Sequence, residues 1–184
     1  MNYLKNRKIR KSLVIIFIAI FFLSVLSFFS ISYLQYEAEK FVLSYVKFDY
    51  GYYQIVTDKY ISKGKVPSKS EVENIKNFIS KEFDKYLSYA KNDSVIKHIG
   101  TFNNLIDQQV SGEMRAYDNV ATYDILSIQY NITYFLVTIK ASQSGIGYYG
   151  KSKVGRTYDN ETTYFCKVRL VDWKWIITDV NQTI

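Results

Sequence analysis

The sequence predicts an α+β protein, in which one N-terminal membrane-spanning helix precedes a domain of helices packed on an antiparallel sheet. Three observations predict it. Residues 13–34 form an uninterrupted apolar run, segments between residues 37 and 92 repeat apolar side chains at helical spacing, and the last third alternates apolar and polar residues as strands do. The 184 residues are 48% hydrophobic and 17% aromatic, so there is enough apolar material for a packed core.

The apolar run from Leu13 to Leu34 carries no charged residue. Twenty-two residues of helix extend about 33 Å, which is enough to cross a hydrocarbon core of about 30 Å. A cleaved signal peptide is the alternative interpretation. Its apolar region would be shorter, and the only small-x-small site, at residues 30–32, is a poor one. The length of the run therefore favours an uncleaved membrane anchor.

The charge is distributed unevenly along the chain. The net charge is +7, and five of the 24 basic residues precede the apolar run, where there is no acidic residue: Lys5, Arg7, Lys8, Arg10 and Lys11. By the positive-inside rule this flank predicts a cytoplasmic tail at residues 1–12, a transmembrane helix at 13–34 and an extracytoplasmic domain at 35–184. The rest of the chain contains 19 basic and 17 acidic residues. The domain therefore lacks the concentrated positive charge that binding to nucleic acid requires.

A helix is predicted directly after the anchor. Its apolar residues recur at spacings of four and three along one stripe: Phe41, Tyr45, Phe48, Tyr52 and Ile55. We expect this stripe to pack on the sheet, because it is too short for the three or four heptads of a convincing coiled coil. Asp49, Tyr50 and Gly51 predict a break in the helix.

A second amphipathic helix is predicted to open at Pro67. Ser68 with Glu71, or Ser70 with Glu73, has the spacing of a capping box. Its apolar face consists of Val72, Ile75, Ile79, Phe83, Tyr86 and Ala90. The lysines and acids on the opposite side indicate a helix at the protein surface.

Strands are predicted in the last third, where apolar residues alternate with polar ones. Between residues 132 and 141 the apolar positions are Phe135, Val137, Ile139 and Ala141. Between residues 161 and 171 they are Tyr164, Cys166, Val168 and Leu170. Residues 119–130 form a less regular additional strand. Cys166 is the only cysteine, so no internal disulfide is possible, and its place beside Val168 predicts a small buried hydrophobic residue.

The last strand holds both tryptophans. After a tight reversal at Val171 and Asp172, period-two alternation places Trp175 and Ile177 on the apolar face. Trp173 is predicted at the sheet edge, beside the turn. We therefore interpret the tryptophans as structural residues of the strand.

Motifs that could carry chemistry are weak. His98 is the only histidine and has no cysteine or carboxylate cluster nearby, so no metal site is expected. The segment G-I-G-Y-Y-G at residues 145–150 matches a dinucleotide fingerprint. However, no helix is predicted after it, and we interpret it as a hairpin loop. The sequence therefore predicts no cofactor.

The order of helices first and then a sheet ending in V-R-L-V-D-W-K-W-I-I-T-D-V resembles the nuclear transport factor 2 superfamily. A terminal W-x-I-x-D-V strand is common there and is matched by Trp175, Ile177, Asp179 and Val180. The resemblance covers residues 37–182 approximately. It implies a cone-shaped domain of N-terminal helices on a curved antiparallel sheet. The opening A-E-K-F-V-L-S-Y-V-K-F-D-Y after one membrane anchor resembles the single-pass assembly scaffolds of type IV secretion and Gram-positive conjugation.

Three functions are compatible with this resemblance. The first is a non-enzymatic scaffold in the bacterial envelope, whose partners are the membrane, other envelope or transfer-apparatus proteins and a second copy of itself. The second is a binding module that holds a small apolar ligand, lipid or peptide in the cone. It is favoured by aromatic residues such as Tyr148 and Tyr149. The third is an isomerase-type enzyme, which needs a buried Asp, with Asp124 as candidate, facing a Tyr donor. Because no catalytic constellation of the family matches residue by residue, we expect no enzyme.

Overall fold

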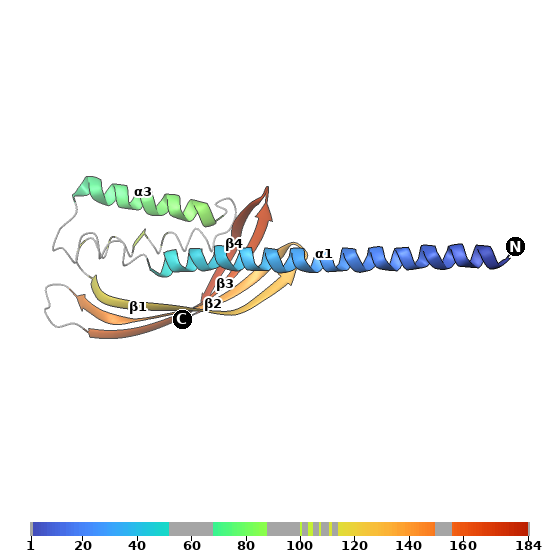
Figure 1. The fold of residues 1–184 in the computed structure, drawn as a ribbon. Coiled ribbons are helices and arrows are strands. Elements are labelled where there is room, and N and C mark those ends of the chain that lie inside the picture. Colours follow the sequence, from blue (N-terminus) through green and yellow to red (C-terminus); the bar gives the residue numbers. More distant parts are fainter. Residues whose placement is uncertain are drawn as a thin grey trace. The chain divides into compact units, whose positions relative to one another are not determined.

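The computed structural model describes residues 2–51, 68–87, 114–149 and 156–183, together with residues 100, 103, 104, 107 and 111. The chain divides into two compact units, Met1–Glu37 and Ala38–Ile184. The elements are helices α1 (Asn2–Tyr50) and α3 (Lys69–Tyr86) and strands β1 (Met114–Asn131), β2 (Tyr134–Tyr149), β3 (Arg156–Val171) and β4 (Lys174–Thr183). One long apolar helix, a second helix and a four-stranded antiparallel sheet confirm the predicted α+β class (Figure 1).

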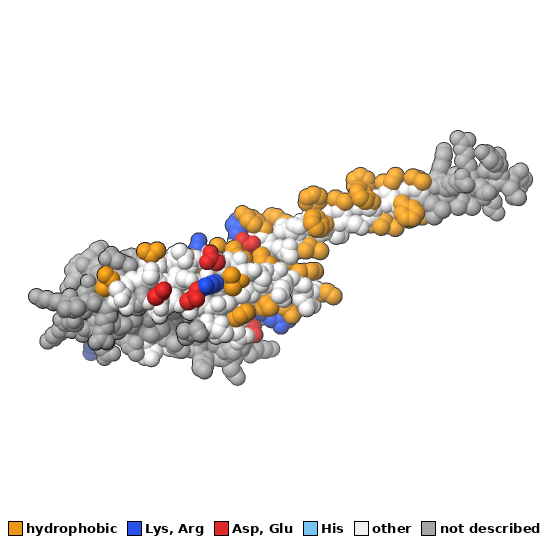
Figure 2. Space-filling model, turned by 90° about the horizontal axis from the view of Figure 1, so that it is seen from below, with side chains coloured by type: hydrophobic (Ala, Val, Ile, Leu, Met, Phe, Trp, Pro, Cys, Tyr) orange, Lys and Arg blue, Asp and Glu red, His pale blue; other side chains and the backbone are white. Residues whose placement is uncertain are grey.

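The first unit is helical and carries the apolar run. Its side chains from Val14 to Phe29 are almost all exposed, and hydrophobic side chains follow its length in Figure 2. The hydroxyls of Ser24, Ser27 and Ser30 each donate to the carbonyl four residues earlier, at 2.8–2.9 Å, so these polar groups are satisfied within the helix. Among the described residues, this helix alone is long and apolar enough to cross a membrane.

The second unit is built on the sheet, whose order β1-β2-β3-β4 follows the chain. The predicted alternation determines its buried face. Directly opposed pairs such as Val137 with Cys166 and Ile139 with Tyr164 are buried together. On the opposite face the side chains are mostly polar, as the solvated side of an antiparallel sheet usually is.

Helix α1 covers the buried face with a stripe that differs slightly from the predicted one. The buried residues are Ala38, Val42, Tyr45, Val46 and Asp49. Phe41 and Phe48 are only half-buried, because they lie on the flank of this stripe and contact α3 instead. The ring of Phe41 lies 5.4 Å from that of Tyr86, and the ring of Phe48 lies 5.3 Å from that of Phe83. The helix ends at Tyr50, while Tyr52 and Ile55 lie outside the described residues.

Helix α3 begins as its sequence predicts. Ser68 is the N-cap, its hydroxyl accepts from the backbone N–H of Glu71, and the Glu71 carboxylate accepts from the N–H of Ser68 at 2.8 Å. Ile75, Ile79 and Phe83 are buried. Directly after the helix, Leu87 forms a parallel bridge with Ile177 and so attaches this segment to β4. Ala90 lies outside the described residues.

The turn between β3 and β4 corrects the prediction for Trp173. Asp172 and Trp173 are the two turn residues, with φ angles of 49° and 62°, so the strand starts one residue later than expected. Two positive φ angles in a two-residue hairpin are typical of a type I′ turn. Trp173 is 93% exposed. Trp175 is half-buried, with its ring 5.8 Å from that of Phe135.

A β-bulge in β4 explains the rest of its pattern. Val168 pairs with Ile177, whereas Lys167 pairs with Asp179, so Thr178 is an extra residue. The bulge shifts the alternation, and both Ile177 and Val180 are buried. Strict period two would have placed them on opposite faces.

The structure corrects the predictions for the glycine segment and for Asp124. Residues 145–149 belong to β2, so the glycine segment is strand and not a hairpin loop, with Gly150 outside the described residues. Asp124 is exposed on β1 and is not a buried acid. His98 lies outside the described residues.

Candidate functional site

The main polar feature inside the second unit is the carboxylate of Asp49, which is only 5% exposed. It lies in the last turn of α1, where the partial negative charge of the helix end disfavours an anion. Burial also disfavours it, because a charge removed from water needs compensating hydrogen bonds. The carboxylate therefore depends on donors from other elements.

The sheet supplies two such donors side by side. The Tyr164 hydroxyl donates to Asp49 Oδ2 at 2.6 Å, and Gln182 Nε2 donates to the same oxygen at 3.3 Å. Tyr164 on β3 and Gln182 on β4 are directly opposed in the register, so their side chains leave the same face of the sheet together. The cross-strand pair is thus a two-donor site that fits the carboxylate.

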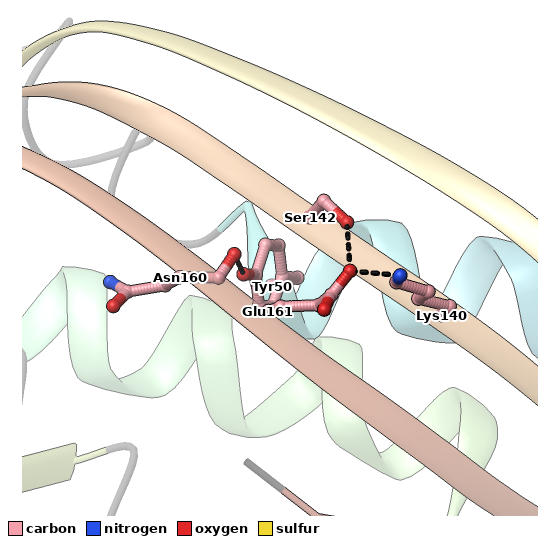
Figure 3. Close-up of polar contacts among 5 residues, drawn as sticks. All are labelled: Tyr50, Lys140, Ser142, Asn160 and Glu161. Atoms are coloured by element: carbon pink, nitrogen blue, oxygen red, sulfur yellow. Dashed lines mark hydrogen bonds and ion pairs between the residues drawn. The ribbon is translucent and has the colours of Figure 1, made fainter.

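Three more tyrosines surround this contact. The ring of Tyr45 lies 6.5 Å from that of Tyr164, and the ring of Tyr50 lies 6.3 Å from Tyr164 and 6.4 Å from Tyr123. The Tyr50 hydroxyl donates to the backbone carbonyl of Asn160 at 2.8 Å, as Figure 3 shows. We call Asp49 and these four tyrosines, together with Gln182, the Asp49 cluster.

The other polar group in Figure 3 belongs to the solvated face. Glu161 on β3 forms an ion pair with Lys140, and Ser142 donates to the same Glu161 oxygen at 3.3 Å. More than half of the Glu161 side chain and about a third of that of Lys140 remain exposed. An exposed pair of this kind adds only about 0–1 kcal/mol to stability, so it is not a functional candidate.

Burial determines the protonation of the tyrosines in the Asp49 cluster. It raises the pKa of Tyr45, Tyr123 and Tyr164 above the ordinary value of 10, and the nearby Asp49 carboxylate raises each pKa further. The Tyr164 hydroxyl therefore stays protonated and remains a hydrogen-bond donor. Burial, followed by the negative charge of Asp49, also raises the pKa of Cys166, so its thiol is not a reactive nucleophile.

This arrangement can fasten the end of α1 to the sheet. At the end of α1, Asp49 accepts hydrogen bonds from β3 and β4, and Tyr50 donates one to the backbone of β3. A role in acid–base catalysis would require a substrate to reach a carboxylate oxygen that already accepts from two neutral donors. The geometry favours a structural clamp.

A second candidate is an apolar surface on the edge strand β1. Val120 is 64% exposed, Leu126 is 55% exposed and Ile125 is also exposed. A register shift between Ile125 and Ser127 leaves Leu126 out of the pairing with β2. Ile125 pairs with Ile139 of the buried face, whereas Val120 pairs with Ser144 of the opposite face, so these two side chains point to different sides of the sheet. We call the adjacent residues Ile125 and Leu126 the β1 patch.

Sequence reasoning located only part of these sites. Tyr45, predicted as a core residue, belongs to the Asp49 cluster, and the predicted core residue Cys166 lies near Asp49. Val168 and Ile177 are buried farther along the sheet. Asp49, Tyr164 and Gln182 were not predicted to meet. The signal for Asp49 was available, because it follows Ala38, Val42 and Tyr45 at spacings of four, three and four on one helical stripe.

Comparisons with known proteins identify no family for this chain. No family model matches the sequence, and no curated protein matches it. A crystal structure of the intermembrane space region of chloroplast protein ARC6 is similar over 55% of this chain and 75% of that chain, at 12% identity and a TM-score of 0.39.

Proposed function

We propose that the protein is a non-enzymatic, membrane-anchored scaffold in the bacterial envelope that helps to assemble a conjugative transfer or secretion apparatus. In this proposal residues 13–34 cross the membrane, the basic tail is cytoplasmic and residues 35–184 are extracytoplasmic. The assignment to a membrane-anchored branch of the nuclear transport factor 2 superfamily is part of the proposal and rests on the terminal strand motif. The observation that carries the docking role is the β1 patch.

The β1 patch is suited to a protein partner for two reasons. An edge strand presents unpaired backbone N–H and C=O groups on its outer side, and these can accept an added strand. Ile125 and Leu126 supply exposed apolar side chains beside that edge. A strand from a partner protein would gain both main-chain hydrogen bonds and side-chain burial.

The orientation is tested by labelling. Ser68 is exposed at the start of α3, so Ser68→Cys should react with a membrane-impermeant maleimide added to intact cells. The native Cys166 is fully buried and gives no background. A labelled variant places residue 68 outside the cell. Reaction only after permeabilisation would reverse the proposed orientation.

The docking role is tested at the β1 patch. Leu126→Lys should lower transfer between cells that carry the apparatus by about tenfold or more, because a charge in a desolvated interface costs at least ~1.4 kcal/mol. Thr122→Lys is the matched control, since Thr122 is an exposed polar residue of the same strand. A photo-reactive amino acid at position 126 should also crosslink to an envelope protein. Equal transfer by both variants would exclude the β1 patch as the docking surface.

A second function, isomerase-type chemistry, is favoured by one observation, the buried Asp49 carboxylate beside the Tyr164 hydroxyl. A carboxylate and a phenol at hydrogen-bonding distance are the groups that proton abstraction next to a carbonyl requires. The variant Asp49→Asn separates the two functions. Asp49→Asn should leave transfer unchanged if the protein is a scaffold. Loss of transfer by a variant that still folds would favour the isomerase-type function.

A further inference from the structure

We propose that the two hairpin turns at one end of the sheet, residues 132–133 and 172–173, dock on the surface of the membrane in which the same chain is anchored. This inference rests on the membrane anchoring of the proposed function, but not on the β1 patch or on any partner protein. The ligand is a lipid surface, and the contact residues are Ile132 and Trp173.

Both turns expose large apolar side chains where polar residues are usual. Trp173 is 93% exposed and Ile132 is 88% exposed, and Leu170 and Val171 beside Trp173 are exposed as well. Turns of this length normally use Asn, Asp or Gly. A tryptophan with a positive φ also costs about 1–2 kcal/mol of backbone energy relative to an ordinary conformation. Folding of the domain alone does not account for a tryptophan at this position.

The two turns lie at the same end of the sheet. In the antiparallel order β1-β2-β3-β4, the β1–β2 and β3–β4 connections occur at one end and the β2–β3 connection at the other (Figure 1). Packed aromatic rings connect them. Tyr130 lies 5.1 Å from Phe135, which in turn lies 5.8 Å from Trp175. The turns therefore form one supported surface.

This end of the sheet is also the end at which the second unit begins. Tyr50 contacts β3 at Asn160, far from the turns. Phe41 lies nine residues earlier on the helix and contacts Tyr86. The residue after Tyr86, Leu87, bridges to Ile177, which pairs with Val168 close to the β3–β4 turn. From Tyr50 to Phe41 the helix thus runs along the sheet toward the two turns.

The chain length brings the membrane surface to the same place. Only residues 35–37 separate the end of the apolar run from Ala38, the first residue of the second unit. Three residues reach about 10 Å when fully extended. Whatever the angle between the two units, the lipid surface lies within that reach of Ala38.

The residues around the turns suit this environment. Tryptophan is enriched at membrane–water interfaces, because its ring is apolar and its N–H finds a polar partner among headgroups. Arg169 and Lys174 lie beside the β3–β4 turn, which holds the acid Asp172, while Lys167 farther along β3 is opposite Asp179. This excess of positive charge favours anionic headgroups.

Lipid contact is measured by quenching of Trp173 in the full-length protein. Trp175→Phe leaves Trp173 as the sole tryptophan, and the protein is reconstituted into phosphatidylcholine–phosphatidylglycerol vesicles with or without lipids brominated near the headgroup. The fluorescence of Trp173 should fall by about half in brominated vesicles, as expected for a ring buried at the headgroup boundary. Ile132→Asp should reduce this quenching, because the two turns dock together.

The matched control moves the reporter to the far part of the sheet. Val120→Trp in a Trp173→Phe/Trp175→Phe protein is also exposed, but it lies roughly 35 Å along β1 from the turn, at about 3.3 Å per residue. It should not be quenched. Equal quenching of both reporters overturns the inference. So does burial of Trp173 that depends only on protein concentration and not on lipid, because contact with a second copy would produce it. Failure of the protein to float with the vesicles contradicts the anchoring itself, whereas flotation without quenching of Trp173 contradicts only the docking of the turns.

Discussion

Tyr164→Phe should lower the free energy of unfolding by about 3 kcal/mol, the larger part of it from the Asp49 carboxylate left without its closest donor. The hydroxyl that the substitution removes lies 2.6 Å from Asp49 Oδ2, and the ring itself stays in place. Gln182 Nε2 donates to the same oxygen at the longer distance of 3.3 Å. The loss is measured by urea unfolding of the full chain in mild detergent.

Asp49→Asn is the matched control, since it keeps the size and an acceptor oxygen but removes the charge. It should cost less than Tyr164→Phe, about 1 kcal/mol. In the double variant the two losses should not add, because both variants change the same contact between Tyr164 and Asp49. Additive losses would mean that the Tyr164 hydroxyl stabilises the domain independently of the Asp49 carboxylate.

The same contact predicts how stability depends on alkaline pH. Burial and the Asp49 carboxylate raise the pKa of folded Tyr164 above its unfolded value of 10. The stabilisation is therefore fully present below about pH 10 and is lost as the pH rises above it, where the unfolded phenol ionises and the folded one does not. Tyr164→Phe should show a shallower loss in this range than the native chain.

Phe83→Ala should destabilise the second unit by about 3–5 kcal/mol, which is the usual cost of removing a fully buried aromatic ring. Phe83 has no exposed surface and its ring contacts those of Tyr45 and Phe48, so it joins α3 to α1. The loss should appear as a lower midpoint of thermal unfolding, followed by circular dichroism.

Phe78 in the same helix is the natural control. Phe78 is 49% exposed. Phe78→Ala therefore makes the same change of residue type and of helix propensity as Phe83→Ala, but removes much less buried surface. It should cost under about 1 kcal/mol. Similar losses for both variants would show that α3 contributes through its own helix stability and not through its packing on α1.

The sequence predicts most of the sheet and of α3 because local patterns determine them. In β2 and β3, the alternation of apolar and polar residues predicts which side chains face the core, because successive side chains of a strand point to opposite faces. The capping box at Ser68 and Glu71 is a contact between residues three apart, so it is visible in the sequence. Such features need no knowledge of the tertiary arrangement.

The remaining features depend on contacts between distant residues or on strained backbone. A β-bulge at Thr178 inverts the alternation of β4, and no local pattern announces it. Trp173 occupies a turn position that turn statistics reserve for small or polar residues. The predicted break at Asp49, Tyr50 and Gly51 agrees with the end of α1 at Tyr50. The partners of the Asp49 carboxylate, Tyr164 and Gln182, lie on distant strands, so no local pattern predicts them.

The separation of these residues along the chain has a consequence for how the protein is made. Asp49 is synthesised 115 residues before Tyr164 and 133 residues before Gln182. Ribosomes add roughly 5–20 residues per second, so roughly 6–27 seconds pass before the sheet that covers the helix is complete. During that interval Val42 and Val46, fully buried in the finished protein, face water or a chaperone. The Asp49 contacts can therefore form only after the final strand has been synthesised.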